Sequence, residues 1–158
     1  MVQGDWGDMK LYTTRLGEIE IDEHKIIHFH SGLLGFPDVK RYVLLDNMNN
    51  PDIPFKCLQS VDDPDLVFVV IDPQLFCSDY NSDIDGHDLR ELNIAGLDDR
   101  CIVVIVTIPH DMPELMTANL QGPLIVNLKT REAKQAVLLG ERYPLRYPVL
   151  QDIPVPST

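Results

Sequence analysis

The sequence predicts a mainly β protein, a small antiparallel β pseudo-barrel or sandwich with one or two short helices. Twelve prolines separate several short apolar runs, which leaves little room for long helices. Two of those runs, residues 66–71 and 101–108, are apolar on both faces and are expected to lie near each other as central strands. With 158 residues the chain is long enough for one well-buried core and short for two.

The expected elements follow along the chain. Residues 10–14 and 18–21 flank Leu16-Gly17 and predict a hairpin. A strand over residues 26–29 is broken by glycines, and Pro37 indicates one helical turn over residues 36–39. Further strands are predicted over residues 42–46, 55–60, 115–120, 124–127 and 133–139, the last two forming a hairpin through residues 129–131.

Only residues 85–92 show a helical pattern, with Leu89 and Leu92 spaced i, i+3 and Asp85 as a candidate cap. Gly32, Gly35 and Gly122 are expected to need unusual backbone angles. We divide the chain into an N-terminal extension over residues 1–8, expected to be flexible, a β domain over residues 9–142, and a C-terminal tail over residues 143–158. The tail holds four prolines and is expected to be extended.

The net charge of −12 is the strongest global signal. It argues against direct nucleic-acid binding, which depends on Lys and Arg at phosphates, and against an anionic membrane surface. It suits a basic protein partner, although charge also keeps proteins soluble. The three cysteines form no C-x-x-C pair and the first twenty residues lack a secretory pattern, so we expect a cytoplasmic protein.

Motifs for chemistry are weak. Residues 81–86 match the opening of a calcium-binding EF-hand loop, but Leu92 stands where its bidentate Glu belongs. His28 and His30 have the spacing of two metal ligands on one strand face, but no third ligand follows at a recognisable distance. We therefore expect both imidazoles to face solvent while Ile27 and Phe29 face the core.

Other catalytic templates are missing from the sequence. It contains no nucleophile elbow and no phosphate-binding glycine loop, and the acidic run over residues 62–65 is typical of a solvated turn. We predict no catalytic residue, no cofactor and no metal. The alternative is a small metal-dependent hydrolase that uses His28, His30 and the loop over residues 79–88. A carbohydrate-binding sandwich is a third hypothesis, but the single Trp lies in the N-terminal extension and offers no stacking platform.

Several segments, in order, resemble the flagellar assembly factor FliW family. They are residues 15–21, 26–29, 32–36, 58–61, 63–68, 72–73, 117–127 and 134–138, together with Tyr80. The resemblance implies a small antiparallel β pseudo-barrel without enzymatic activity. It also implies a cytoplasmic protein that binds flagellin and antagonises CsrA, an RNA-binding translational repressor, so that flagellin translation is coupled to flagellin export.

The candidate protein-binding residues are polar or aromatic. Asn119, Gln121 and Asn127 alternate with apolar neighbours and form either a polar patch or a set of amides that bond to the backbone of a turn. Tyr80 and Phe36 are aromatic candidates for interface anchors, although core packing is the commoner role of such a Phe. Asp63 and Asp65 complete the set.

Overall fold

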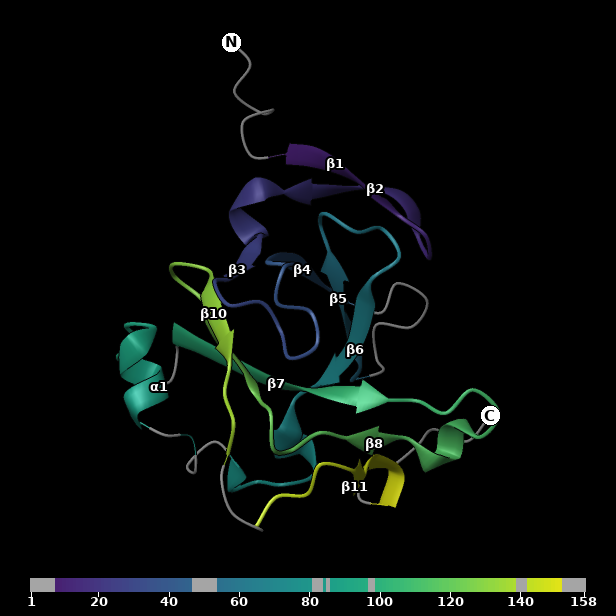
Figure 1. The fold of residues 1–158 in the computed structure, drawn as a ribbon, viewed down its shortest axis with the longest axis vertical. Coiled ribbons are helices and arrows are strands. Elements are labelled where there is room, and N and C mark those ends of the chain that lie inside the picture. The colour runs from purple at the N-terminus through teal and green to yellow at the C-terminus, as the bar shows by residue number, and fades with distance from the viewer. Residues whose placement is uncertain are drawn as a thin grey trace.

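The computed structural model describes residues 8–46, 54–80, 84, 86–96, 99–138 and 142–151 (Figure 1). Eleven strands and one α-helix lie within these residues, and short 3₁₀ helices connect some of them. The strands are β1 (Asp8–Thr13), β2 (Gly17–Asp22), β3 (Ile27–Phe29), β4 (Arg41–Asp46), β5 (Lys56–Ser60), β6 (Val67–Ile71), β7 (Arg100–Thr107), β8 (Thr117–Ala118), β9 (Leu124–Asn127), β10 (Glu132–Gln135) and β11 (Tyr147–Pro148). The helix is α1 (Gly86–Glu91), and the 3₁₀ helices span Glu23–Lys25, Pro73–Leu75, Pro113–Leu115 and Val149–Gln151.

Seven strands close into a barrel. Their order is β7, β6, β5, β4, β3, β10, β9, and β9 pairs again with β7, joining Cys101 to Val126 and Val103 to Leu124. The pairs are antiparallel except β3 with β10, where His28 lies opposite Glu132. The mainly β class predicted from the sequence is confirmed, as are the β1–β2 and β9–β10 hairpins and the pairing of the two apolar strands, now β6 and β7.

The barrel interior is one apolar cluster, because alternate residues of each strand point inward. Its aromatic members touch: the rings of Phe29 and Tyr42 lie 5.5 Å apart, and those of Tyr42 and Phe68 lie 6.2 Å apart. The other buried members are Ile27, Leu33, Leu58, Val70, Val103, Leu124, Val126 and Ala133.

A second cluster lies outside the barrel, against the outward side chains of β7. There the rings of Tyr80 and Tyr143 pack in a T-shaped arrangement with their centroids 4.8 Å apart, in the same cluster as Val104, Val106 and Val149. β8 and β11 extend the sheet from the C-terminal half of β7, at the bottom of Figure 1. Residues 143–151, assigned to an extended tail from the sequence, are thus packed onto the domain, whereas residues 152–158 lie outside the described residues.

Helix α1 is held against β10 by charge. Lys134 Nζ lies 2.7 Å from Asp88 Oδ1 and also pairs with Glu91, whose pKa it lowers through their hydrogen bond. Figure 1 shows α1 beside β10 and the start of β7. The predicted helix is therefore confirmed, and it is short and fixed by a strand residue from elsewhere in the chain.

The β1–β2 hairpin covers the end of the molecule at the top of Figure 1. Leu11 and Ile21 pack with Ile26 and Val43 in a third apolar cluster. Asp8, expected to belong to the N-terminal extension, is the first residue of β1, and residues 1–7 lie outside the described residues.

Three local predictions need correction. Residues 36–39 form a β-turn, closed by a 3.3 Å hydrogen bond from Val39 N to Phe36 O, and not a helical turn. The strand predicted over residues 115–120 shrinks to β8, because Pro113 begins a 3₁₀ helix that runs to Leu115. Gly32 and Gly35 have positive φ, 67° and 90°, but Gly122 does not; a Cβ there would instead lie 2.7 Å from Gln135 Nε2.

Candidate protein-binding surface

The loop between β3 and β4 presents apolar side chains at one end of the barrel. Reciprocal backbone hydrogen bonds join Leu33 and Phe36, with N···O distances of 3.3 and 2.8 Å. Leu33 is buried, whereas Leu34 between them is 65% exposed. Phe36 is 40% exposed, and its ring packs against that of Phe68 in a T-shaped arrangement, with the ring centroids 5.5 Å apart. The positive φ of Gly32 and Gly35 permits this tight loop, which passes in front of the barrel in Figure 1.

A side chain of β10 joins this loop to the segment over residues 119–122. Gln135 Oε1 accepts a hydrogen bond from Leu34 N at 2.8 Å, and Gln135 Nε2 donates to Gly122 O at 3.0 Å. Leu138 N then donates to Gln121 O at 2.8 Å, which leaves Val137 exposed beside Gln121. We call Leu34, Phe36, Gln121 and Val137 the joined-loop surface.

The Asn119 side chain stabilises the segment of the joined-loop surface that carries Gln121. Its Oδ1 accepts hydrogen bonds from Gln121 N and Gly122 N at 3.0 and 3.1 Å, the geometry of an Asx turn. The half-buried amide therefore shapes the loop that carries Gln121. This is the backbone-bonding role that the sequence analysis left open for Asn119.

Asn127 and Tyr80 are buried and hold backbone groups. Asn127 Nδ2 donates to Leu92 O at 2.7 Å, and its Oδ1 accepts from Lys129 N and Thr130 N at 2.8 and 3.1 Å. Tyr80 Oη donates to Leu120 O at 2.5 Å, and burial raises the pKa of Tyr80. In this conformation neither side chain reaches the surface, so neither is placed to contact a partner.

Asp63 and Asp65 lie in the turn between β5 and β6. Ser60 Oγ accepts a hydrogen bond from Asp63 N at 2.9 Å, and Asp63 Oδ1 accepts one from Asp65 N at 3.0 Å. The side chains of Ser60 and Asp63 therefore stabilise the turn. Asp65 also accepts a hydrogen bond from the Thr14 hydroxyl in the β1–β2 loop. The carboxylate of Asp65 is exposed, and the interpretation as a solvated turn is confirmed.

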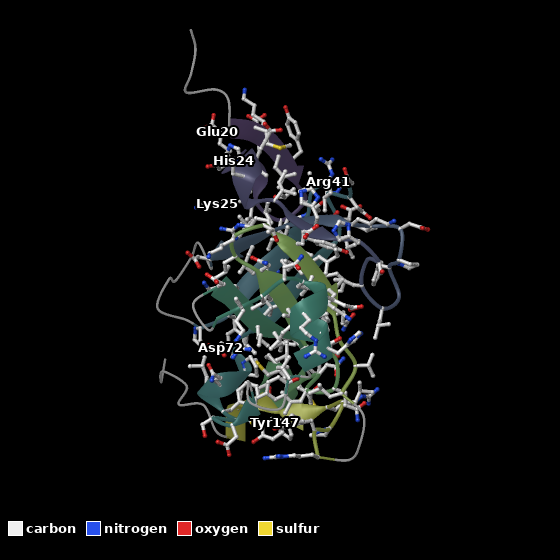
Figure 2. The ribbon with its side chains drawn as sticks, turned by 90° about the vertical axis from the view of Figure 1, so that its left-hand side faces the viewer. Glu20, His24, Lys25, Arg41, Asp72 and Tyr147 are labelled. Carbon is white, nitrogen blue, oxygen red and sulfur yellow. The ribbon has the colours of Figure 1, made fainter. Side chains whose placement is uncertain are left out.

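Acidic side chains continue over the outer face of the hairpin. Glu18 and Glu20 are exposed on β2, opposite Tyr12 and Lys10 of β1. A hydrogen bond from Tyr12 to Glu18 raises the pKa of that phenol. Figure 2 shows Glu20 at the same end of the molecule as His24 and Lys25. We call Glu18, Glu20 and Asp65 the acidic face.

The residues of the alternative metal site do not come together in the described part of the chain. His28 on β3 and His30 directly after it are exposed, while Ile27 and Phe29 are buried, as expected. His30 Nε2 lies 3.0 Å from Glu132 Oε1, and the described residues contain no group of three or more potential metal ligands. Residues 81–83 and 85 of the acidic loop lie outside the described residues.

Comparison with known proteins places these features in a family. The family model described as "FliW protein" matches residues 10–149, which is most of the chain and includes β11. The chain belongs to the FliW family. No helix among the described residues is long and apolar enough to cross a membrane.

Individual relatives match over nearly their whole length. The chain is 38% identical over 145 residues to the flagellar assembly factor FliW of Thermoanaerobacter pseudethanolicus, covering 92% of this chain and 95% of that one. It is 41% identical over 145 residues to the flagellar assembly factor FliW of Treponema pallidum, covering 92% and 94%. A crystal structure of a flagellar assembly factor FliW superposes with a TM-score of 0.76 at 37% identity, covering 89% of this chain and 96% of that one.

The structure adds residues that sequence reasoning missed. Leu34 and Val137 have the most exposed apolar side chains of the joined-loop surface, and Gln135 links its two loops. The glycines on either side of Leu33-Leu34 were the available signal, because a tight turn leaves the residue at its tip exposed. The role of Gln135 depends on a contact between residues 101 positions apart, which no local pattern contains.

Proposed function

We propose that this chain is a non-enzymatic, cytoplasmic regulator of flagellum assembly that binds flagellin and antagonises a CsrA-type translational repressor. Membership of the FliW family supports the role in flagellar assembly and is the observation that carries the proposal. In the proposed cycle flagellin occupies the protein while it accumulates. Export of flagellin then frees the protein to bind the repressor and relieve repression of flagellin translation.

The acidic face is our candidate for the contact with the repressor. A protein that binds RNA presents Lys and Arg to phosphates, so a partner with a net charge of −12 attracts it over long range. Glu18, Glu20 and Asp65 are exposed and lie on two segments joined through Thr14. Bound there, the protein also adds a negative field close to the RNA site. Antagonism therefore does not require that the two footprints overlap.

The joined-loop surface is our candidate for the contact with flagellin. Interface centres are enriched in apolar and aromatic side chains that lose their water on binding, and Leu34, Phe36 and Val137 are exposed in the free protein. Gln121 supplies an adjacent amide for hydrogen bonding. The loop is cross-braced by Gln135, so little conformational entropy is lost when a partner binds.

Capture from cells tests the partners. Tagged protein is recovered from motile cells and bound proteins are identified by mass spectrometry. Flagellin and the CsrA-type repressor are expected. Recovery of neither would contradict the proposal.

Titration with purified repressor tests the electrostatic part. Affinity is measured from about 50 to 500 mM salt for the unmodified protein and for E18Q/E20Q. The matched control is D111N/E114Q, which removes the same charge from exposed positions on another loop. We expect the affinity of the unmodified protein to fall as the salt concentration rises, because screening weakens exposed charge pairs. At the same salt concentration, the affinity should be lower in E18Q/E20Q than in the unmodified protein, and unchanged in D111N/E114Q. An affinity that does not change with salt would show that the charge serves solubility alone.

A further inference from the structure

Strand β7 is paired along one edge and only partly along the other. On the first edge β9 pairs with residues 100–103 and β8 pairs with Val106 and Thr107. On the second edge β6 pairs with residues 104–106, and no described strand continues the pairing beside residues 100–103. Figure 1 shows β6 meeting β7 partway along its length. The first half of β7 is therefore an open strand edge on the side of β6.

The main-chain groups of Arg100 and Ile102 point out of this open edge. Asn119 N donates to Ile105 O at 2.9 Å, so the main-chain groups of Ile105 point toward the first edge, where β8 lies. Because successive residues of a strand alternate in this respect, those of Val104, Ile102 and Arg100 point toward the second edge. Val104 is paired there with β6, whereas Ile102 and Arg100 have no strand partner on that side among the described residues.

The sequence explains why β6 stops before it covers this edge. Two residues beyond the last pair of β6 with β7, residue 73 would lie opposite Ile102. Residue 73 is a proline, which has no N–H to donate to Ile102 O. Asp72 instead accepts a hydrogen bond from Gln74 N at 2.9 Å and caps the 3₁₀ helix Pro73–Leu75, which takes the chain out of the sheet.

A cavity of about 600 Å³ lies against the open edge, at the mouth of the barrel. Its floor consists of the inward-facing apolar residues Leu44, Val70 and Val103. Ile102 borders the cavity although its side chain packs in the outer cluster, so it contributes its main chain. Cavities that hold ligands measure about 300–1,000 Å³, and this one has room for side chains of a bound segment. Free main-chain groups beside an apolar floor are the two features of a site that binds an extended peptide as an added strand.

The charge around the rim of this cavity is negative in balance. Lys56 Nζ lies 3.2 Å from Asp46 Oδ1, so this cation is paired. The guanidinium of Arg100 lies on the outer side of the barrel, because Arg100 alternates with the inward-facing Val103 and its neighbours along β7. The exposed carboxylate of Asp72 has no ion pair with a described residue. A segment bound here is therefore expected to carry Lys or Arg beside Asp72.

We propose that the open edge of β7 binds an extended peptide segment of another protein, which adds a strand antiparallel to β7 in line with β6. The main chain of the segment bonds to Arg100 and Ile102. Its apolar side chains, at alternate positions, lie over Val70 and Val103, and a Lys or Arg at its start lies beside Asp72. A second copy of this chain is a poor occupant, because it would bring a further net charge of −12 to an acidic rim.

This edge is separate from the surfaces assigned to protein partners. Phe36 of the joined-loop surface packs against Phe68 near the start of β6, and Asp65 of the acidic face directly precedes that strand, whereas the cavity adjoins its end. Figure 2 shows Asp72 low in the molecule and Arg41, at the start of β4, near the top. The test uses synthetic peptides, so its outcome does not depend on the proposed function.

Titration with the peptide acetyl-Lys-Val-Thr-Val-Thr-Val-amide, followed by backbone amide NMR, tests the proposal. The peptide should shift the signals of Val70, Ile102 and Val103 saturably. With the Val side chains in the barrel mouth, the Thr N–H groups of an antiparallel strand face β7 and the Val N–H groups face away. N-methylation of both Thr residues should therefore lower the affinity at least tenfold, because two hydrogen bonds are lost, whereas N-methylation of two Val residues should not change it. Any other pattern would overturn the proposal.

One substitution and a matched control test the charge at the rim. D72N removes the carboxylate but keeps an oxygen that can cap the 3₁₀ helix, and it should weaken the peptide about threefold, the effect of an exposed ion pair. D22N removes the same charge from the corresponding cap of the 3₁₀ helix Glu23–Lys25, where Asp22 accepts from His24 N, and should leave the affinity unchanged. Equal effects of D72N and D22N would contradict the placement of the peptide.

Hydrogen exchange of the unmodified protein tests whether the edge is open. The N–H of Ile102 should exchange at least tenfold faster than that of Val103, which is paired with Leu124 of β9. Saturating peptide should slow Ile102 severalfold and leave Val103 unchanged. If Ile102 were already as protected as Val103 without peptide, another part of the chain would occupy the edge and the proposal would fail. Protection of Ile102 that grew with protein concentration would identify a second copy as the occupant and would likewise refute it.

Discussion

Replacing Asn127 by Ala tests whether its side-chain amide stabilises the fold or contacts a protein partner. The buried side chain bonds to one carbonyl and two N–H groups on two segments, Leu92 after α1 and the turn at Lys129-Thr130. Leaving the buried Leu92 carbonyl without a donor costs about 1–3 kcal/mol, and each exposed turn N–H adds roughly 0.5 kcal/mol because water replaces the lost acceptor. We expect N127A to lower the free energy of unfolding by about 2–4 kcal/mol.

Urea unfolding followed by circular dichroism measures this change. With a slope of about 2 kcal/mol per molar urea, the midpoint should fall by roughly 1–2 M at unchanged slope. Q121A is the matched control. The Gln121 side chain makes no hydrogen bond with a described residue, so its loss should change stability by no more than about 0.5 kcal/mol. If N127A retained full stability and lost affinity for a partner, Asn127 would be a contact residue and the reasoning from its buried bonds would fail.

Three further predictions concern single side chains. Tyr42 Oη is buried and lacks a hydrogen-bond partner among the described residues, so Y42F should raise the free energy of unfolding by about 1 kcal/mol. Burial also raises the pKa of Tyr42 to about 12 from 10.0. The folded state therefore holds the proton longer, its stability falls as pH rises from 10 to 12, and Y42F should reduce that fall in alkaline denaturation. A Cβ on Gly32 would lie 2.5 Å from Phe36 O, whereas one on Gly35 meets no atom within 4 Å. Thermal unfolding should thus show a loss of roughly 2 kcal/mol or more for G32A and about 1 kcal/mol for G35A, and equal losses would contradict the close approach. K134M removes both ion pairs to α1, so amides of α1 should exchange hydrogen faster while those of β6 do not change; uniform acceleration would indicate global destabilisation instead.

The strands were predictable where the pattern is local. Residues 66–71 and 101–108 are apolar on both faces because β6 and β7 contact the barrel interior on one side and outer elements on the other. The closure of the barrel was not predictable in this way. It depends on β7 with β9 and on the parallel pair of β3 with β10, whose partners lie far apart in the sequence.

The extended tail predicted for the C-terminal segment from its proline content is wrong for residues 143–150, which are packed onto the domain. The prolines at 144 and 148 suggest an extended tail, but Tyr143 and Val149, directly before and after this pair, pack into the outer cluster. β11 pairs with β8 over two residues. For the candidate site, side-chain chemistry alone could not separate a surface amide from a buried one. Gln121 and Asn127 have the same polar group, and only burial distinguishes them.

The pairing of β3 with β10 has a consequence for synthesis. The partners of His28 and Phe29 are Glu132 and Ala133, so more than a hundred residues must leave the ribosome before β3 gains its second neighbour. Until then the edge of β3 that pairs with β10 has no partner strand. Nascent chains of this length can therefore be bound by chaperones or associate with each other. The ring of strands can close only after β10 has been synthesised.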